Sequence, residues 1–126
     1  SQMMTAVVSN QKIPAGSYIT AEMLKTADID LLQSRGKTVS APEHIIGARS
    51  KKALNAGQIV TQSDLCLVCK GDVVTIAGVS NGLSVTTQAI ALQDGTLGDG
   101  VKVQNLQSKR VVTAQITAVK RVEIKL

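Results

Sequence analysis

A short pattern occurs twice in the first half of this sequence, and it constrains the fold more than any other feature. Residues 13–24 and 54–65 share an apolar residue, an Ala-Gly pair, two largely apolar residues, a Thr and a closing Leu. Gly16 and Gly57 can take positive φ in a turn, after which the apolar pair returns the chain to a core. The repeat therefore predicts two similar loops within one small domain.

Capping residues near the repeat predict short helical turns. Thr20 and Thr61 are suited to be N-caps, and Asp64 stands at the third helical position of the second turn. Residues 40–43, Ser-Ala-Pro-Glu, form another capping pattern, which predicts a short helix through Ile46 that ends at Gly47. We expect strands in this half at residues 6–9 and 49–53.

The composition favours strands over helices. The hydrophobic fraction is 44%, yet the chain has no Phe, no Trp and one Tyr, so its core must consist of Val, Ile, Leu, Ala and Met. β-Branched residues pack well in a pleated sheet and fit less comfortably in helices. A length of 126 residues allows two small modules, which we place at residues 1–65 and 66–126.

The second half has the sequence pattern of a small all-β domain. Alternating segments are separated by the dipeptides Asn81-Gly82, Asp94-Gly95 and Asp99-Gly100, which supply the left-handed φ values of tight turns. Gly82 and Gly95 are thus expected to be structural turn residues, like Gly16 and Gly57. Short strands with frequent turns predict a small barrel or sandwich. The expected strands are residues 73–76, 83–87, 89–92, 101–105, 111–118 and 122–126.

The net charge of +5 permits an acidic partner, but it does not favour nucleic acid. Single-strand and RNA binders stack bases on aromatic rings, and Tyr18 is the one aromatic residue here besides His44. No segment has the ~20 apolar residues of a membrane span. Residues 1–10 also lack the features of a signal peptide, so the protein is either cytosolic or has lost an export signal.

Cys66 and Cys69 are the most reactive-looking pair. Zinc would require about four ligands, and His44 is the one candidate third ligand. In an extended strand, residues three apart lie roughly 10 Å from each other, beyond the ~7 Å limit for a disulfide. A disulfide therefore requires a turn at Leu67-Val68, and free, partly buried thiols stay open as the alternative. A redox-active dithiol is disfavoured because no thioredoxin-like pattern surrounds the pair.

Other polar residues do not form a catalytic set. His44 has no partner Ser or Cys to activate, and Asp94 and Asp99 are typical turn formers. The glycine-rich segment at residues 94–100 lacks the Lys-Ser/Thr ending of a phosphate-binding loop. We expect no enzyme activity, no cofactor and no metal.

Longer blocks of sequence resemble known families. The paired turns, joined by residues 46–49, resemble the SAF domain, a β-clip module. The sequence that follows resembles the C-terminal half of the flagellar basal-body P-ring formation chaperones, often called FlgA. The resemblance lies in the order and spacing of residues 68–76, 82–85, 91–99, 103–105 and 108–111. The resemblance implies a mainly β fold, with a SAF-type β-clip followed by a small β-barrel or sandwich.

The function that the resemblance implies is binding without a reaction. Such a protein is periplasmic, binds P-ring subunits and assists assembly of the flagellar ring, its signal peptide having been removed. Family members commonly carry a further N-terminal domain, which is absent from this sequence. We expect the partner to pair with an edge strand, an apolar groove or the cleft between the modules, and the oligomeric state stays open. The candidate steering residues are Arg49, Lys51, Lys52, Lys109 and Arg110.

Two other functions fit part of the sequence. A carbohydrate-binding SAF module accessory to a sugar-acid or sialic-acid enzyme would explain the first half alone, and a saccharide titration would reveal it. A periplasmic SAF protein of pilus assembly would share the location and the lack of catalysis. Residues 91–99 are what argues against the pilus alternative.

Overall fold

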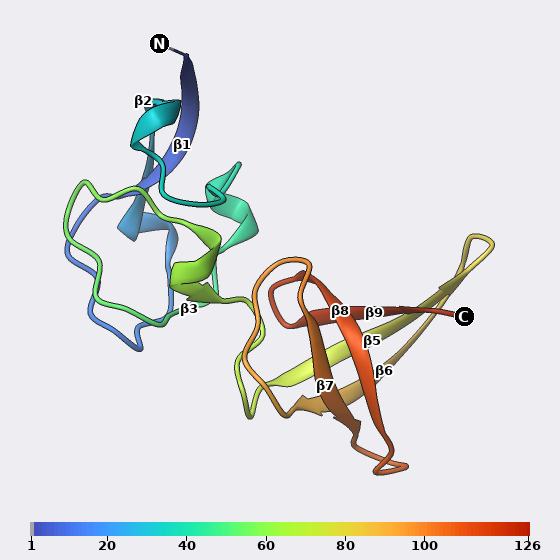
Figure 1. Cartoon of the computed structure of the whole chain (residues 1–126). Coiled ribbons are helices and arrows are strands. Elements are labelled where there is room, and N and C mark those ends of the chain that lie inside the picture. The colour runs from blue at the N-terminus through green and yellow to red at the C-terminus, as the bar shows by residue number, and fades with distance from the viewer. Residues whose placement is uncertain (1) are drawn as a thin grey trace. The chain divides into compact units, whose positions relative to one another are not determined.

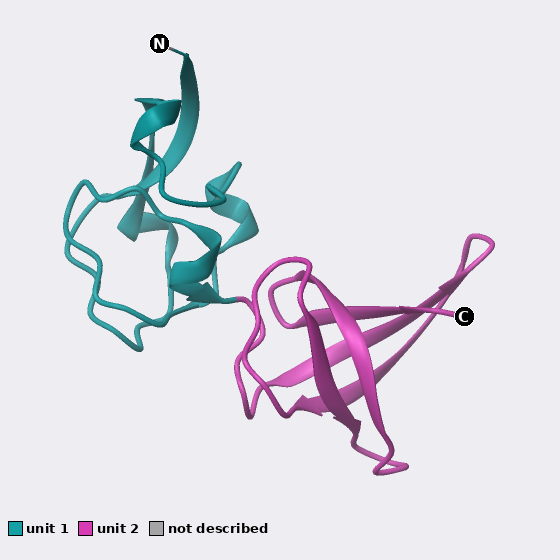
Figure 2. Cartoon of the chain, in the orientation of Figure 1, with its two compact units in different colours: residues 1–66 teal, residues 67–126 magenta. Residues whose placement is uncertain are grey.

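A computed structural model, which describes residues 2–126, shows a mainly β chain with short 3-10 turns (Figure 1). This confirms the expected fold class. The chain divides after Cys66 into two compact units (Figure 2), one residue beyond the boundary drawn from the sequence. Within the described residues, no helix is long and apolar enough to cross a membrane.

In the first unit, the two copies of the repeat lie directly against each other. Ile13 and Leu54 occupy the same position of the repeat and exchange two main-chain hydrogen bonds, of 2.9 and 2.8 Å. Both side chains are completely buried, so the repeat builds the core of this unit. The four 3-10 turns are η1 (Ala21–Met23), η2 (Leu31–Gln33), η3 (Pro42–His44) and η4 (Gln62–Asp64).

Four strands frame the first unit as two antiparallel pairs. The strands are β1 (Met3–Ser9), β2 (Leu24–Asp30), β3 (Arg49–Ser50) and β4 (Leu65–Cys66), paired β1 with β2 and β3 with β4. An isolated bridge between Val8 and Ile59 links β1 to the second copy of the repeat. The two strand pairs therefore remain separate two-stranded sheets, and the Val8–Ile59 bridge connects the first of them to the repeat.

Several local expectations for the first unit were wrong. The strand expected at residues 49–53 ends at Ser50, whose hydroxyl bonds the carbonyl of Lys52 in a turn. The helix expected to run through Ile46 is the single 3-10 turn η3, with Ala41 at its N-cap position. Strand β2 was not predicted at all.

The second unit is a closed five-stranded barrel. Its strands are β5 (Val73–Ser80), β6 (Leu83–Ala91), β7 (Gly100–Asn105), β8 (Val111–Ala118) and β9 (Arg121–Lys125). Consecutive strands are antiparallel, and a parallel pairing of β5 with β9 closes the ring. Of the two architectures expected, the structure is the barrel. The strands expected at residues 83–87 and 89–92 are one continuous strand, β6.

Gly95 does not have the role expected of it. Gly16, Gly57 and Gly82 have φ of 85°, 81° and 79°, whereas the positive φ near Gly95 belongs to Gly98. Gly95 instead forms a bridge with Val68. A Cβ at Gly95 would lie 2.7 Å from both Ile116 Cδ1 and Val101 Cγ1, so close packing is what requires glycine here.

Candidate functional site

Strand β6 leaves part of its outer edge without a neighbouring strand. On one side β6 pairs with β5 over its whole length, but on the other side β7 pairs only with Ala89–Ala91. Residues 83–87, which we call the open edge, therefore have no strand beside them, whereas the carbonyl of Gln88 accepts a 3.1 Å hydrogen bond from the N–H of Leu106. Figure 1 shows this hairpin arm, coloured yellow, extending beyond the rest of the barrel.

The turn at the tip of the hairpin determines which main-chain groups face outward. Asn81 and Gly82 both have positive φ, the geometry of a two-residue type I′ turn. In such a hairpin the closing residues, Ser80 and Leu83, are hydrogen-bonded to each other, and alternate residues bond to the partner strand. The N–H and C=O groups of Ser84 and Thr86 therefore face outward.

An apolar strip runs beside the open edge. Leu83 and Val85 are 67% and 59% exposed, and Leu126 is 69% exposed. A Cβ at Gly78 would meet the Leu126 side chain at 3.0 Å, and Gly78 is the cross-strand partner of Val85. Partners in an antiparallel pair share one face of the sheet, so these three side chains, the apolar strip, lie on the same face.

Natural sheets protect their exposed edges, and this edge lacks such protection. The usual means are charged residues, especially Lys, together with Pro and β-bulges. Residues 83–88 contain no charged residue and no Pro, and they pair with β5 in unbroken register. The open edge can therefore accept an additional strand through main-chain hydrogen bonds.

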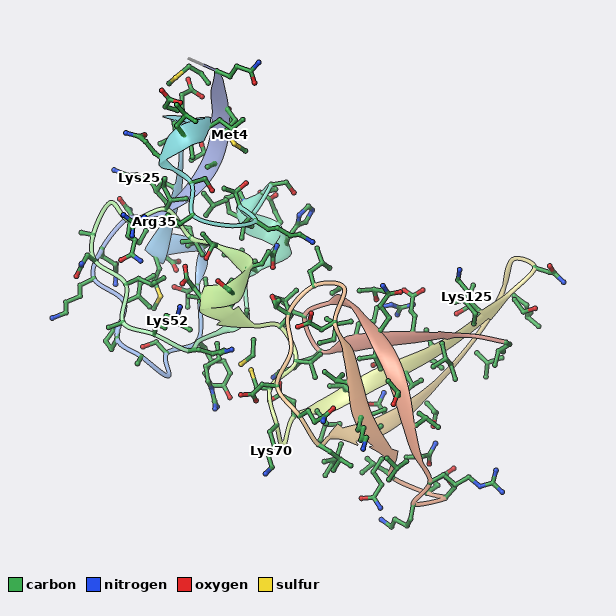
Figure 3. All side chains as sticks on the ribbon, in the orientation of Figure 1. Met4, Lys25, Arg35, Lys52, Lys70 and Lys125 are labelled. Atoms are coloured by element: carbon green, nitrogen blue, oxygen red, sulfur yellow. The ribbon has the colours of Figure 1, made fainter. Side chains whose placement is uncertain are left out.

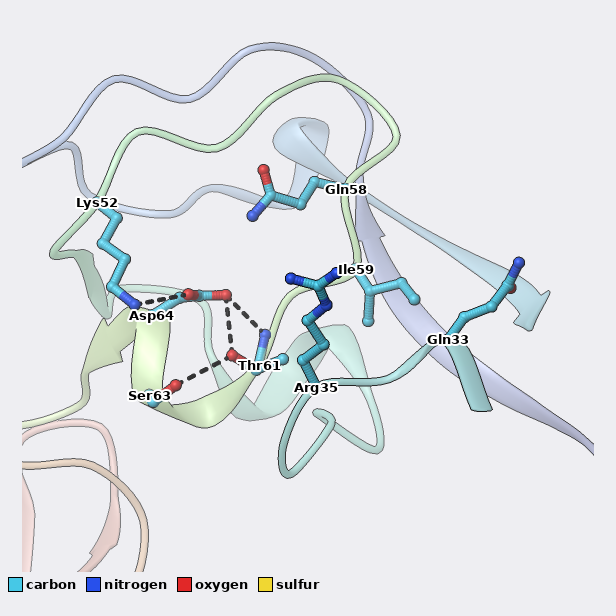
Figure 4. Close-up of a pocket in the computed structure, with 8 residues that line it drawn as sticks. All are labelled: Gln33, Arg35, Lys52, Gln58, Ile59, Thr61, Ser63 and Asp64. Atoms are coloured by element: carbon cyan, nitrogen blue, oxygen red, sulfur yellow. Dashed lines mark hydrogen bonds and ion pairs between the residues drawn. The ribbon is translucent and has the colours of Figure 1, made fainter. Parts of the chain in front are cut away.

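The first unit contains a separate, polar pocket of about 310 Å³ (Figure 4). One lining residue is Asp64, whose Oδ2 accepts hydrogen bonds of 3.0 Å from both the N–H and the hydroxyl of Thr61. The other carboxylate oxygen lies 3.7 Å from Lys52 Nζ. The lining residues, which define the polar pocket, are Gln33, Arg35, Lys52, Gln58, Ile59, Thr61, Ser63 and Asp64.

The basic residues proposed from the sequence are divided between the two units. Arg49 is half-buried, and its guanidinium lies over the Tyr18 ring and donates a 2.6 Å hydrogen bond to the Tyr18 hydroxyl. Lys51 and Lys52 are both exposed, and Lys52 Nζ lies 3.7 Å from a carboxylate oxygen of Asp64. The exposed residues Lys109 and Arg110 belong to the turn between β7 and β8 of the second unit. Figure 3 shows other cations, such as Lys25 and Lys125, scattered over both units.

Both cysteines are disulfide-bonded, and as the only two in the chain they bond to each other. Strand β4 ends at Cys66, and from there the main chain of Leu67 and Val68 bonds to Gly95. The segment therefore does not continue as an extended strand. A departure from the extended form at Leu67-Val68 is what the sequence analysis required for a disulfide between Cys66 and Cys69. The described residues contain no group of three side chains suited to hold a metal ion.

The remaining polar candidates have structural contacts. The exposed His44 ring lies 3.1 Å from the Ser40 hydroxyl. Asp99 accepts a hydrogen bond from the N–H of Thr96, as a turn-forming carboxylate does, whereas Asp94 accepts one from the N–H of Lys70, 24 residues away along the chain. These contacts place the three side chains in separate local structures.

One carboxylate has a shifted pKa. Hydrogen bonds from its own main-chain N–H and from the Thr20 side chain lower the pKa of Glu22 below its ordinary value. A carboxylate with a depressed pKa stabilises the fold above its unfolded-state pKa, and this contribution is lost as the pH falls through the folded-state value. Thr20 therefore bonds a carboxylate near its helical turn, as Thr61 does with Asp64.

Sequence reasoning missed Arg35, Gln58 and the open edge. Arg35 and Gln58 lie in different segments, and only the fold brings them to one pocket. The open edge depends on β6 being longer than its pairing with β7. The one feature of the sequence that could have indicated the open edge is the uncharged run of residues 83–88 after an Asn-Gly turn.

Comparison with known proteins identifies the family. A family model described as "Chaperone for flagella basal body P-ring formation" matches residues 4–124. The flagellar protein FlgA of Rhizobium meliloti (strain 1021) is 28% identical over an alignment of 117 residues, and the match covers 90% of this chain and 70% of that protein. A distal basal body ring component protein of Caulobacter vibrioides is 28% identical over 106 residues, 79% of this chain and 40% of the relative.

A solved structure supports the fold. The closed form of Salmonella FlgA matches with a TM-score of 0.58 at 21% identity, over 98% of this chain and 64% of that chain. The chain thus spans less than two thirds of that structure and of the Caulobacter relative. Because the family model covers nearly all of its residues, this chain belongs to the family of chaperones for flagella basal body P-ring formation.

Proposed function

We propose that the chain is a periplasmic binding protein, not an enzyme, which holds a flagellar P-ring subunit during assembly of the ring. Family membership supports this function, and the open edge of β6 is the observation that gives it a mechanism. An extended segment of the ring subunit would add a strand beside residues 83–87. Its apolar side chains would cover Leu83 and Val85.

The expected strength of this contact suits a chaperone that must release its client. The outward groups of Ser84 and Thr86 can form four main-chain hydrogen bonds, each contributing roughly 0.5–1.5 kcal/mol net. Burial of the apolar strip adds to this at roughly 25 cal/mol per Å². Association itself costs about 4–15 kcal/mol, which is of the same order as these gains, so we expect weak, reversible binding.

The exposed cations Lys51, Lys109 and Arg110 remain candidates for steering an acidic partner. Charges outside a contact act on the association rate, and salt screens them. Reversing these charges would lower the association rate and flatten its dependence on salt.

The test is titration calorimetry of purified ring subunit into the full chain and two variants. Thr86→Pro removes an outward N–H and keeps the pairing with β5, because proline is tolerated at a sheet edge. Val85→Lys places a charge on the apolar strip. The matched control is Val111→Lys, which changes a valine that is also exposed, 49%, on another strand.

We expect both edge variants to weaken binding at least about tenfold, which corresponds to roughly 1.4 kcal/mol, while Val111→Lys binds like the unmodified chain. Unchanged affinity in both edge variants would remove the open edge from the mechanism. Failure of the unmodified chain to bind would contradict the proposed partner. Sedimentation would show whether a second copy occupies the edge instead, since Thr86→Pro would then dissociate a dimer.

A further inference from the structure

The polar pocket of the first unit has more hydrogen-bond donors than acceptors to receive them. Asp64 is its single carboxylate; its Oδ2 already accepts two hydrogen bonds from Thr61, and its Oδ1 lies 3.7 Å from Lys52 Nζ. The guanidinium of Arg35 has no hydrogen bond or ion pair to any described residue. Arginine can donate five hydrogen bonds and accept none, so the donors of this side chain are available to a ligand that carries acceptors.

Gln58 presents a second free donor. Its Oε1 accepts a 3.0 Å hydrogen bond from the main-chain N–H of Asn55, which fixes the orientation of the amide. The other amide atom, Nε2, consequently faces the pocket, as Figure 4 shows. The main-chain N–H of Gln58 bonds to the Ser9 hydroxyl, so the residue is held from both sides.

The segment that carries Arg35 is also held in place. The main-chain N–H of Gln62 donates a 2.8 Å hydrogen bond to the carbonyl of Lys37, and Thr38 forms a bridge with Thr61. Figure 4 shows Arg35 and Lys52 on opposite sides of the pocket, with Gln58 between them. The main chain of the segment that carries Arg35 and the amide of Gln58 are thus fixed beside the same opening, which lowers the entropic cost of binding.

We propose that the polar pocket binds a carboxylate group, with Arg35 as its principal partner and Gln58 Nε2 and Lys52 as further donors. The pocket carries two cations and one carboxylate, so its excess of one positive charge matches a monoanion better than a phosphate of charge near −2. Arginine pairs with a planar carboxylate through two parallel hydrogen bonds.

The size of the pocket limits the ligand. A volume of about 310 Å³ lies at the lower end of the range for ligand sites, about 300–1,000 Å³. It accommodates either a small free acid or one acidic side chain of a polypeptide. The site goes beyond the proposed function and is independent of it, because the open edge belongs to the other unit.

The test is an amide-resolved NMR titration of the full chain with two probes. One probe is acetate, and the other is a blocked alanine peptide with a central glutamate; the same peptide with glutamine is the neutral comparison. We expect saturable shifts at residues 34–38 and 58–61 with the acids. Binding of the glutamine peptide should be at least about tenfold weaker, since a hydrogen bond to a charged group is worth about 1.5–3 kcal/mol.

Three variants separate a specific site from general attraction to a basic protein. Arg35→Gln removes the principal donor from an exposed side chain, and Gln58→Glu keeps the acceptor for Asn55 while it replaces the free donor with a negative charge. Both should weaken binding of the acids at least about tenfold. Lys102→Gln removes an exposed cation from the second unit that has no proposed role, and it should leave binding unchanged.

The outcomes decide both the site and the source of the carboxylate. Tighter binding of the glutamate peptide than of acetate identifies an acidic side chain, and binding of acetate alone identifies a free acid. Binding of both peptides with equal affinity, or equal effects of Arg35→Gln and Lys102→Gln, would overturn the proposal. So would the absence of saturable shifts in the pocket with either acid.

Discussion

At the scale of single residues, close packing determines some positions more strictly than turn geometry does. Gly95 was chosen from the sequence as a turn residue because it follows an aspartate, and Asp-Gly is a common turn dipeptide. In the fold it lies against Ile116 and Val101, which come from other strands. No local pattern reveals such a contact, so this role could not be predicted from sequence.

The first prediction concerns this contact. Gly95→Ala would press a methyl group against two buried side chains, and overpacking of this kind costs about 1–3 kcal/mol. Urea unfolding of the variant measures this loss. The control is Gly100→Ala, whose Cβ would lie 3.4 Å from Thr113 Cγ2 and should change stability by less than about 0.5 kcal/mol. Equal stability of the two variants would contradict the packing argument.

At the scale of elements, the hydrophobic pattern predicted the strands of the barrel better than those of the first unit. Strand β8 was predicted with its observed bounds, and β7 and β9 within one residue at each end. Strand β2 was missed because its sequence, Leu-Lys-Thr-Ala-Asp-Ile-Asp, is largely polar and only Leu24 and Ile29 are buried. It is a strand because β1 pairs with it along its whole length.

The candidate sites were less predictable than the strands. The cation pairs were visible in the sequence, but their partners were not: Arg49 is engaged by Tyr18, and Lys52 by Asp64. The charge of a side chain is local information, whereas its free or paired state depends on segments far away along the chain. The residues of the polar pocket illustrate this, because they converge from residues 33–35 and 52–64.

The second prediction compares the helical turns of the two repeat copies. Asp64→Ala would leave the Thr61 N–H, in a buried residue, without its acceptor, and such a loss costs about 1–3 kcal/mol. Glu22→Ala should cost less, because Glu22 is exposed and water can replace its contacts. Urea unfolding at neutral pH measures both losses. If the two losses were equal, burial would not be what distinguishes the copies.

At the scale of the whole molecule, each unit contains the partners of its own strands. All five barrel strands lie within residues 67–126, and the closing pair joins the first and last of them. Parallel pairs require a long connection, and this one spans the rest of the barrel. The barrel is therefore complete only when β9 is present.

The third prediction follows from this closure. A fragment of residues 67–126 with Cys69→Ser should fold alone, giving dispersed amide NMR signals and cooperative unfolding. A fragment of residues 67–118 lacks β9 and leaves β5 and β8 each without a neighbour, so it should not give a dispersed spectrum. A disordered longer fragment would show instead that the barrel depends on the first unit.

The structure of the boundary between the units also affects where proteases cut the chain. Enzymes that separate domains cut at exposed segments that they can draw into an extended form. Here Cys66 and Cys69 are cross-linked, and the main chain of Leu67 and Val68 is hydrogen-bonded to Gly95, with the Leu67 carbonyl bonded to Lys120. Digestion should therefore nick an exposed turn such as Asn81-Gly82 before it parts the two units.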